Sequence, residues 1–587
     1  MCYITDAMNN ELTAAPASSQ DGFWTPPQEQ ERGAEYNPSQ RLAIGSDAPV
    51  TVATAGPGSG KSHTIIGRIL HGPAAPLKTL VVTYTTSAAK VLKRRLVEAG
   101  AEVFFAGTVH AFLFRLIRQY ANKVGYSPHV GILDAEAADL LLVRVTEMHR
   151  FTGTYLQLEA ELKRGPIPAP KTDPELVCSA YWAKLRESNV VDFATIIRLG
   201  TQLLNDTEVR QAFPADLSLC WDEAQDMANE YLAVFNSIPA RWKFATGDPK
   251  QSIFSFLGAN VANIMEVAAA GATVIQLAEN YRCPESVCRV ANALIAANPV
   301  HDETVSATGQ QGRVELFDAG DEVKEAVMMA QKANALLAAD PHCTIAVLVM
   351  THDHRRQLEA FLEGHGVLVE KREDAMPPRD WKETRSLLNA LSDPDNVLFC
   401  EDLVRAWKPT DANAIIKAAV ASLQSLNDAS LHLPYLSTAA EVVAFIEAKK
   451  PSPESVKRLR DALATLAENG ESSIADLQIA LAEQSEPKEV VQGGKVRVMT
   501  YWAAKGMEFD NVFLPALEET MMPPVSYTRT PALLEECRRV LYVGVTRAKK
   551  NLFLSWAGTR RPIHGKFLGK PQEQERSRFL TEMGFAP

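Results

Sequence analysis

The chain has 587 residues, 46% apolar and 22% charged, which is typical of a globular protein with roughly three or four domains. No run approaches the roughly 18 to 20 apolar residues of a membrane span. The first residues also lack a basic stretch followed by an apolar one, so we expect a cytoplasmic protein without membrane contact. The net charge of −11 excludes a chain coated in positive charge, which leaves local basic stripes or uncharged stacking for any nucleic-acid contact. The eight cysteines lack zinc-site spacing and are expected to be reduced.

The N-terminal half predicts an arm followed by an interrupted sheet. Residues 1–35 are rich in Pro, Gln, Ser, Asn and Glu without periodicity, which is typical of a disordered arm. Over 36–108, β-branched runs such as VTVATA and TLVVTY alternate with helical patterns, which indicates a parallel α/β sheet. Residues 109–185 show leucine and alanine at helical spacing and predict a helical insertion. The sheet resumes over 186–278 with LSLCW and WKFAT.

The C-terminal half follows the same plan. Residues 279–373 begin a second α/β set with GRVELFDAG and TIAVLVM, and residues 374–490 are again helical in pattern. Strands return over 491–587 with KVRVMT, NVFLPAL and NLFLSW. The sequence therefore predicts an α/β protein with two similar parallel-sheet domains, each carrying a helical insertion.

A glycine-rich segment, AGPGSGKS, lies between the first apolar strand and an amphipathic helix. It fits G-x-x-x-x-G-K-[ST] in the strand–loop–helix context that a phosphate-binding loop requires. Its backbone N–H groups can surround phosphate, Lys61 can neutralise the β and γ oxygens, and Ser62 can hold Mg²⁺. The predicted phosphate-binding residues are Gly56, Gly58, Ser59, Gly60, Lys61 and Ser62.

Two adjacent carboxylates, Asp222 and Glu223, follow the apolar strand LSLCW. Sheets of this kind place their ligands at the carboxyl ends of strands. An isolated Asp-Glu pair is more often solvated surface, but an upstream phosphate loop favours a catalytic pair. We therefore predict that Asp222 holds Mg²⁺ with Ser62 and that Glu223 orients water.

Two further features are candidates for the same phosphate. The loop ATGDPKQSIFSFLGA follows another strand and places Gln251 near Phe254 and Phe256, so it could link nucleotide state to a stacked base. Arg282 in ENYRCP and Arg547 in YVGVTRAKK are candidate arginine fingers from the second domain.

In chain order, nine segments resemble the conserved boxes of UvrD/Rep/PcrA-type helicases of superfamily 1, over about residues 36–580. They are NPSQRLAI, AGPGSGKS, VVTYTTSAAKVL, GTVHAF, WDEAQD, GDPKQSIFSFLGA, NYRCP, TYWAAKGMEFD and RRVLYVGVTRA. The resemblance implies two RecA-like motor domains whose cleft closes on ATP and reopens after hydrolysis. It also implies 3′ to 5′ movement along a single strand, with Gln251 contacting the γ-phosphate and Arg282 and Arg547 as the fingers.

The resemblance further implies residues that bind the nucleoside. Gln40 would read adenine, Tyr281 would stack on it, and Glu508 would bind the ribose. His63 stands where relatives usually carry an arginine next to the base. We therefore expect this chain to differ from them in nucleotide preference or in nucleotide affinity.

For the DNA path, the family pattern points to Tyr84, Thr108, His110, Phe254, Phe256 and Trp502. Stacking of a base on an aromatic side chain contributes roughly 1–3 kcal/mol and is insensitive to sequence. Each aromatic taken alone would more often be core. Trp502 replaces the usual histidine, Leu257-Gly258 replaces the usual Arg-Gly, and the second insertion is short. Translocation is therefore a safer expectation than strong unwinding.

The leading hypothesis is an ATP- and Mg²⁺-dependent 3′–5′ DNA translocase and helicase. It would act on single-stranded DNA and 3′-tailed duplexes in repair, replication or recombination. The alternative is a nucleic-acid-sensing ATPase subunit that regulates a protein partner, such as a nuclease in a defence system. The short insertion and the altered DNA contacts motivate this alternative. The sequence leaves open the pathway, the oligomeric state and RNA as a track.

Overall fold

The computed structural model describes residues 36–586 with gaps. The gaps are 129, 134, 155–156, 159–160, 163–169, 256–257, 371–380, 395, 408–410, 412–414, 417–430, 432, 469–473, 475–476, 479–480, 482–493 and 562–569. The predicted arm over 1–35 therefore lies outside the described residues, as does Phe256. Among the described residues, no helix is long and apolar enough to cross a membrane.

The first motor is built on a six-stranded parallel sheet of order β3–β2–β6–β7–β1–β8. Its strands are β1 (Val50–Ala55), β2 (Thr79–Thr83), β3 (Phe105–Thr108), β6 (Ser218–Trp221), β7 (Trp242–Gly247) and β8 (Thr273–Leu277). Successive side chains point to opposite faces, so Val52 enters one buried cluster and Ala53 the other. Helices cover both faces, as an apolar parallel sheet requires.

The helices of the first motor are α2 (Pro38–Gly45), α3 (Lys61–His71), α4 (Thr86–Glu98), α5 (Val109–Gln119), α9 (Phe193–Leu204), α10 (Thr207–Gln211), α11 (Asn229–Ser237) and α12 (Val261–Ala269). On one face, Ile65 of α3 and Leu92 of α4 pack under the sheet. On the other, Leu113 of α5 and Leu199 of α9 do so. Helix α5 thus belongs to the sheet's core, although it begins where the helical insertion was expected to start.

The second motor is a five-stranded parallel sheet of order β11–β15–β14–β12–β13. Its strands are β11 (Arg313–Asp318), β12 (Ile345–Val349), β13 (Val496–Thr500), β14 (Phe509–Leu514) and β15 (Ala548–Trp556). The covering helices are α13 (Glu285–Ile295), α14 (Glu322–Ala339), α15 (His352–Gly364), α22 (Pro531–Val545) and α23 (Arg578–Glu582). The structure also describes three short strand pairs: β4 (Gly131–Ile132) with β5 (Val190–Val191), β9 (Glu279–Asn280) with β10 (Val305–Ser306), and β16 (Thr559–Arg560) with β17 (Gln572–Glu573). The expected α/β fold with two parallel-sheet motors and helical insertions is confirmed.

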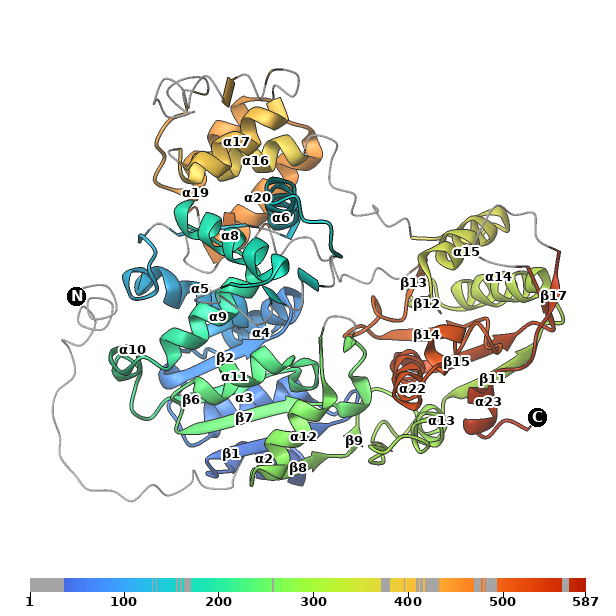
Figure 1. Ribbon diagram of the computed structural model, residues 1–587. Coiled ribbons are helices and arrows are strands. Elements are labelled where there is room, and N and C mark those ends of the chain that lie inside the picture. The colour runs from blue at the N-terminus through green and yellow to red at the C-terminus, as the bar shows by residue number, and fades with distance from the viewer. Residues whose placement is uncertain are drawn as a thin grey trace, which may run out of the picture.

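The helices inserted in both motors gather into one insertion body beside the first motor (Figure 1). It contains α6 (Ala135–Met148), α8 (Asp173–Glu187), α16 (Trp381–Ser392), α17 (Val397–Trp407), α19 (Ala439–Ala448) and α20 (Pro453–Glu468). Leu141 and Trp182 from the first insertion share one apolar cluster with Leu388 and Val442 from the second. The two insertions were expected as separate elements, and their common core is a property of the folded chain alone.

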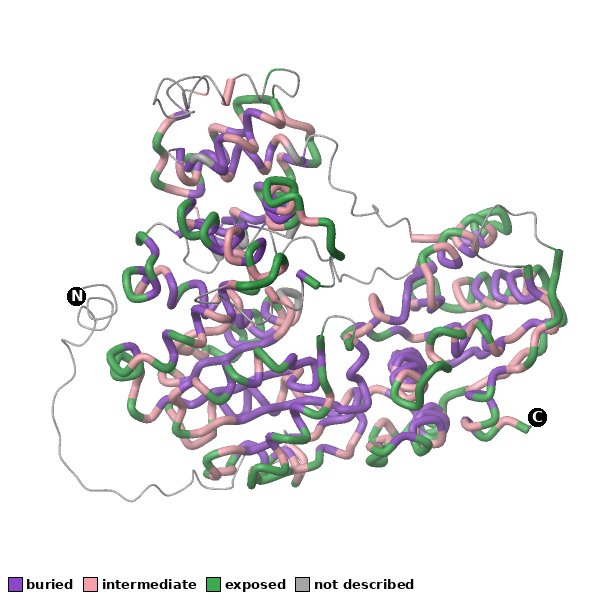
Figure 2. Tube along the Cα trace, viewed as in Figure 1, coloured by how far each residue is buried: buried purple, intermediate pink, exposed green. Residues whose placement is uncertain are grey.

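Burial follows this division (Figure 2). The central strands of both sheets are mostly buried, and the insertion body has its own buried centre. Among the described residues, each motor therefore has a buried cluster on either face of its sheet, and the insertion body has a core of its own.

Candidate active site

The phosphate-binding loop leaves the carboxyl end of β1 and leads into α3. Gly58 and Gly60 have φ of +65° and +80°, in the left-handed region that favours glycine. A Cβ on Gly58 would lie 2.5 Å from the Arg282 Cβ, so the second motor approaches the loop closely. Gly60 precedes α3, whose N-terminal N–H groups and dipole favour an anion. Lys61 and Ser62 lie in the first turn of that helix.

The two predicted carboxylates lie at the end of β6, next to this loop. Asp222 accepts hydrogen bonds from the Thr246 hydroxyl at 2.8 Å and from the Glu223 N–H at 2.9 Å. Burial and the neighbouring Glu223 raise the pKa of Asp222 above its usual range. Burial also pushes the pKa of Glu223 upward, but the charges of Lys61 and Lys505 outweigh burial and hold it below its usual value. The environment therefore favours an ionised Glu223 and leaves Asp222 short of positive charge.

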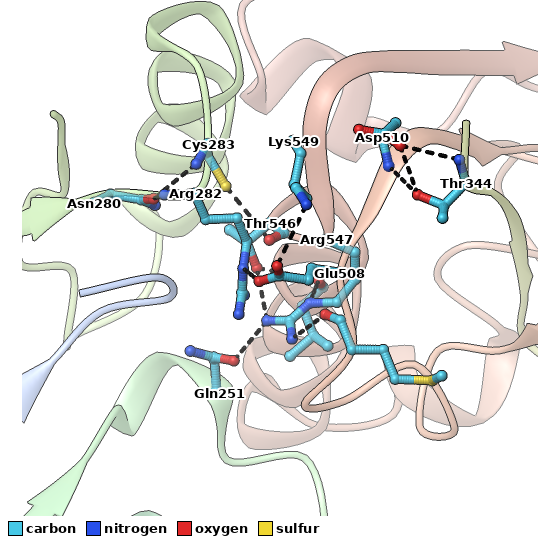
Figure 3. A network of polar contacts seen from close by, with 12 residues as sticks. Gln251, Asn280, Arg282, Cys283, Thr344, Glu508, Asp510, Thr546, Arg547 and Lys549 are labelled. Atoms are coloured by element: carbon cyan, nitrogen blue, oxygen red, sulfur yellow. Dashed lines mark hydrogen bonds and ion pairs between the residues drawn. The ribbon is translucent and has the colours of Figure 1, made fainter. Parts of the chain in front are cut away.

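Gln251 and the two arginines join the motors at this point (Figure 3). The Gln251 amide donates to the Asp248 carboxylate at 2.8 Å and accepts from the Arg547 guanidinium at 2.8 Å. Arg547 is 1% exposed, and burial, followed by the charge of Arg282, lowers its pKa to about 9. The Arg282 Nε donates to Glu508 at 2.8 Å. The structure thus brings Gln251 and both candidate fingers together at the motor interface, with Arg282 next to the phosphate loop.

The residues expected at the base lie on α2, on α3 and across the motor interface. Gln40 donates to the Ser59 carbonyl at 3.1 Å, directly behind the phosphate loop. The Asn37 amide donates to the Tyr281 hydroxyl at 2.9 Å, and the Tyr281 side chain is 48% exposed. His63 stacks on Tyr36 with ring centroids 4.5 Å apart. The arrangement leaves the Tyr281 ring accessible to a nucleotide base.

Glu508, expected at the ribose, takes part in ion pairs of the second motor. It accepts from Arg282 and lies 3.6 Å from the Lys549 ammonium. These cations hold the pKa of Glu508 below its usual value although burial opposes them. The carboxylate therefore orients Arg282, and its predicted contact with a ribose stays a prediction.

The expected DNA-path residues of the first motor form an aromatic group at the carboxyl ends of β2 and β3. The Tyr84 ring lies 5.4 Å from that of Tyr231, edge to face. Tyr231 also contacts the His110 ring nitrogen at 3.4 Å, and Phe193 lies 5.0 Å from the imidazole. Burial lowers the pKa of His110 to about 4, so the imidazole is neutral near pH 7. Thr108 uses its hydroxyl to accept from the Ala111 N–H and cap α5.

The second-motor side of the expected DNA path is tied to the loop after β7. Trp502 donates its indole N–H to the Ile253 carbonyl at 3.0 Å. Phe254 lies under the Lys505 ammonium, 4.7 Å from the ring centroid. These contacts place Trp502 at the interface of the motors, and its proposed contact with DNA is untested.

Two domain models of known families match the chain. The UvrD/REP helicase N-terminal domain matches residues 36–270, and the UvrD-like helicase C-terminal domain matches residues 421–559, together more than half of the chain. The chain is 26% identical to the ATP-dependent DNA helicase PcrA of Leuconostoc citreum, over 93% of this chain and 84% of the relative. It is 28% identical to the ATP-dependent DNA helicase UvrD2 of Mycobacterium tuberculosis, over 94% and 82% respectively.

The chain belongs to the UvrD/REP helicase family. It is therefore an ATP-hydrolysing DNA helicase, as the order of its motifs and the position of its site imply. Helicases of this family use ATP with a divalent metal ion. The resemblance stated from the sequence is confirmed.

In this UvrD/REP helicase, sequence reasoning missed an ion pair that crosses the site. The Lys505 ammonium lies 2.5 Å from the Asp226 carboxylate, and both side chains are nearly buried. Burial raises the pKa of Asp226 to about 6, although Lys505 opposes that shift. Both residues stood inside the recognised segments WDEAQD and TYWAAKGMEFD, but no local pattern shows that they meet across the motors. Tyr231 was missed because it lies outside the nine segments and meets Tyr84 and His110 only in the folded chain.

Proposed function

We propose that this helicase translocates along single-stranded DNA with 3′ to 5′ polarity and opens 3′-tailed duplexes. One observation carries the proposal: the hydrolysis site is divided between the motors, with Lys61 and Glu223 on one side and Arg547 on the other. A site assembled from two bodies links its occupancy to their separation. We take residues 36–108 with 186–278 as the first motor domain and residues 279–373 with 491–587 as the second. The insertions are then 109–185 and 374–490, and α5 at the start of the first one packs in the core of the first motor.

Mg²⁺ fits the donors that the first motor offers. Ser62 supplies a hydroxyl and Asp222 a carboxylate, which are oxygen ligands of the kind Mg²⁺ prefers. The raised pKa of Asp222 supports this assignment, because a cation beside it would restore the ionised form. Bound there, Mg²⁺ would neutralise charge on the phosphate oxygens. Glu223, held ionised, accepts a proton from or orients the attacking water.

The arginines complete the site when the motors close. Arg547 is aligned by the Val543 and Met507 carbonyls, and Arg282 is aligned by Glu508. Prealigned cations stabilise the charge that develops on the transferred phosphoryl group. Gln251 links both sides, since its amide contacts Asp248 in the first motor and Arg547 in the second.

For the track, we propose the aromatic group around Tyr84 and His110, with Phe254 and Trp502 at the interface. Uncharged stacking suits a chain with a net charge of −11. Repair, replication or recombination of DNA are the processes that such a motor serves.

The test measures ATP hydrolysis with and without single-stranded DNA, together with strand displacement from 3′- and 5′-tailed duplexes. We expect stimulation by DNA and displacement from the 3′-tailed duplex alone. Lys61→Ala is the inactive control, because without the ammonium the phosphate oxygens lose their cation. Hydrolysis that DNA leaves unchanged, or displacement from the 5′ tail, would contradict the proposal.

The alternative, an ATPase subunit that switches a protein partner, has one structural observation in its favour. The second insertion shares its core with the first, so it is held against another part of the chain by apolar packing. A sensor of this kind would hydrolyse ATP in response to DNA yet displace little until a partner such as a nuclease is added. Displacement by the purified chain alone would exclude this alternative.

A further inference from the structure

The loop after β7 leaves the first motor but is held by the second. Three consecutive carbonyls, those of Gln251, Ser252 and Ile253, each accept a hydrogen bond from the second motor. The donors are the Lys505 ammonium at 2.9 Å, the Arg539 Nε at 2.8 Å and the Trp502 indole N–H at 3.0 Å. Each donor reaches a main-chain acceptor, so the contacts position the backbone of the loop independently of its side chains.

Two side chains of this interface loop, residues 251–255, also contact the second motor. Ile253 has no exposed surface and belongs to the apolar core of the second motor, together with Leu348 and Val540. The Ser255 hydroxyl donates to the Glu536 carboxylate, whose oxygens lie 2.5 and 2.6 Å away. A buried aliphatic side chain contributes about 1.5–3 kcal/mol of stabilisation when it leaves water. The loop is therefore fixed to the second motor by packing as well as by hydrogen bonds.

The flanks of the loop remain with the first motor. On one side, the Asp248 N–H donates to the Gln225 side chain at 2.9 Å. On the other, the Asn260 N–H donates to the Met227 carbonyl at 3.1 Å. Gly258 lies between the loop and this second anchor with φ of +88°. At each end of the loop, the chain therefore passes from contacts with the first motor to contacts with the second within a few residues.

We infer that residues 251–255 move with the second motor during the nucleotide cycle, and that Trp502 is the positioning residue that holds them there. This inference rests on the proposed function, because it assigns a mechanical role to the loop of the same site. The second motor would then move Gln251, at the phosphates, and Phe254, beside the proposed DNA path, together as one segment. The contacts to the first motor that separation must break include Gln251–Asp248 and Lys505–Asp226, together with the hydrogen bond from the Tyr281 N–H to the Gly58 carbonyl.

The variant that tests this is Trp502→Phe, which removes the indole N–H and keeps an aromatic ring. We expect the number of ATP molecules hydrolysed per nucleotide travelled to rise by roughly two- to tenfold, the range for one lost hydrogen bond. The KM for ATP should stay near that of the wild type, because no nucleotide contact is lost. Trp502→His restores an N–H donor and should recover most of the coupling. Trp407→Phe, at an exposed tryptophan of the insertion body, is the matched control.

A second variant and a second measurement distinguish loss of this positioning from loss of the fold. Arg539→Met removes the donor to Ser252 and should raise the same ratio. Hydrogen exchange of the peptide with residues 251–255 should become faster in both variants, with or without DNA, while the melting temperature changes little. An unchanged ratio and unchanged exchange in both variants would overturn the inference. If DNA did not stimulate ATP hydrolysis by the wild type, the proposed function would be overturned instead. The hydrogen-exchange measurement on residues 251–255 would still decide the inference.

Discussion

The two halves of the chain meet at two interfaces of opposite character. Between the motors, with the loop 251–255 counted on the second, the contacts are mainly polar: Lys505 pairs with Asp226, and Gln251 bonds to Asp248. Between the insertions they are mainly apolar, with one cluster drawing side chains from α6, α8, α16, α17, α19 and α20. The Phe399 ring packs so closely on Gly131 that an added Cβ would lie 2.9 Å from it.

This difference teaches which parts of the molecule can separate. A hydrogen bond between protein groups contributes only about 0.5–1.5 kcal/mol net, because water can replace either partner. A phosphate oxygen can also replace the acceptor. Apolar side chains have no such substitute, and each buried one adds about 1.5–3 kcal/mol. The motor interface is therefore suited to open and close with the nucleotide, whereas the insertion body is suited to stay intact. The Arg144–Asp402 ion pair at 2.6 Å and the hydrogen bond from Asn396 to the Ser188 carbonyl reinforce it.

The largest expected effect comes from breaking the motor interface at Arg547. We expect Arg547→Ala to slow ATP turnover by about 10³ to 10⁵, as loss of an arginine finger does. Arg289→Ala changes an exposed arginine on α13 and should leave turnover unchanged. Steady-state hydrolysis with saturating single-stranded DNA measures both. Near-normal turnover in Arg547→Ala would remove this arginine from the hydrolysis site.

The next effect is on the apolar interface. Phe399→Ala should destabilise the insertion body by about 3–5 kcal/mol, because it empties a buried site that Gly131 and Val190 line. Thermal unfolding should then show an early transition, while ATP turnover without a duplex persists. Tyr435→Ala, at a 68% exposed side chain of the second insertion, is the control. A single transition with equal loss of turnover would mean that the insertion body and the motors unfold together.

The sequence predicted what is local in this comparison and missed what is distant. The strand β1 and the loop from Gly56 to Ser62 follow from an apolar run and a motif within a dozen residues. The common core of the insertions depends on helices that are more than 200 residues apart, so periodicity shows which faces are apolar but not which ones meet. The same limit applies to Lys505 and Asp226, which are 279 residues apart.

The smallest effect concerns the pH dependence of the Lys505–Asp226 contact. The pKa of Asp226 rises from 3.8 to about 6 on folding, chiefly because of burial, so the folded chain binds this proton more tightly than the unfolded chain. The wild type therefore loses stability at this site as pH rises through that window, whereas Asp226→Asn does not titrate there. We expect any deficit in the melting temperature of Asp226→Asn to shrink between about pH 4 and pH 7. A deficit that grows with pH would mean that the ion pair with Lys505 outweighs the cost of burying the carboxylate. The polar interface would then resist opening more than its geometry implies.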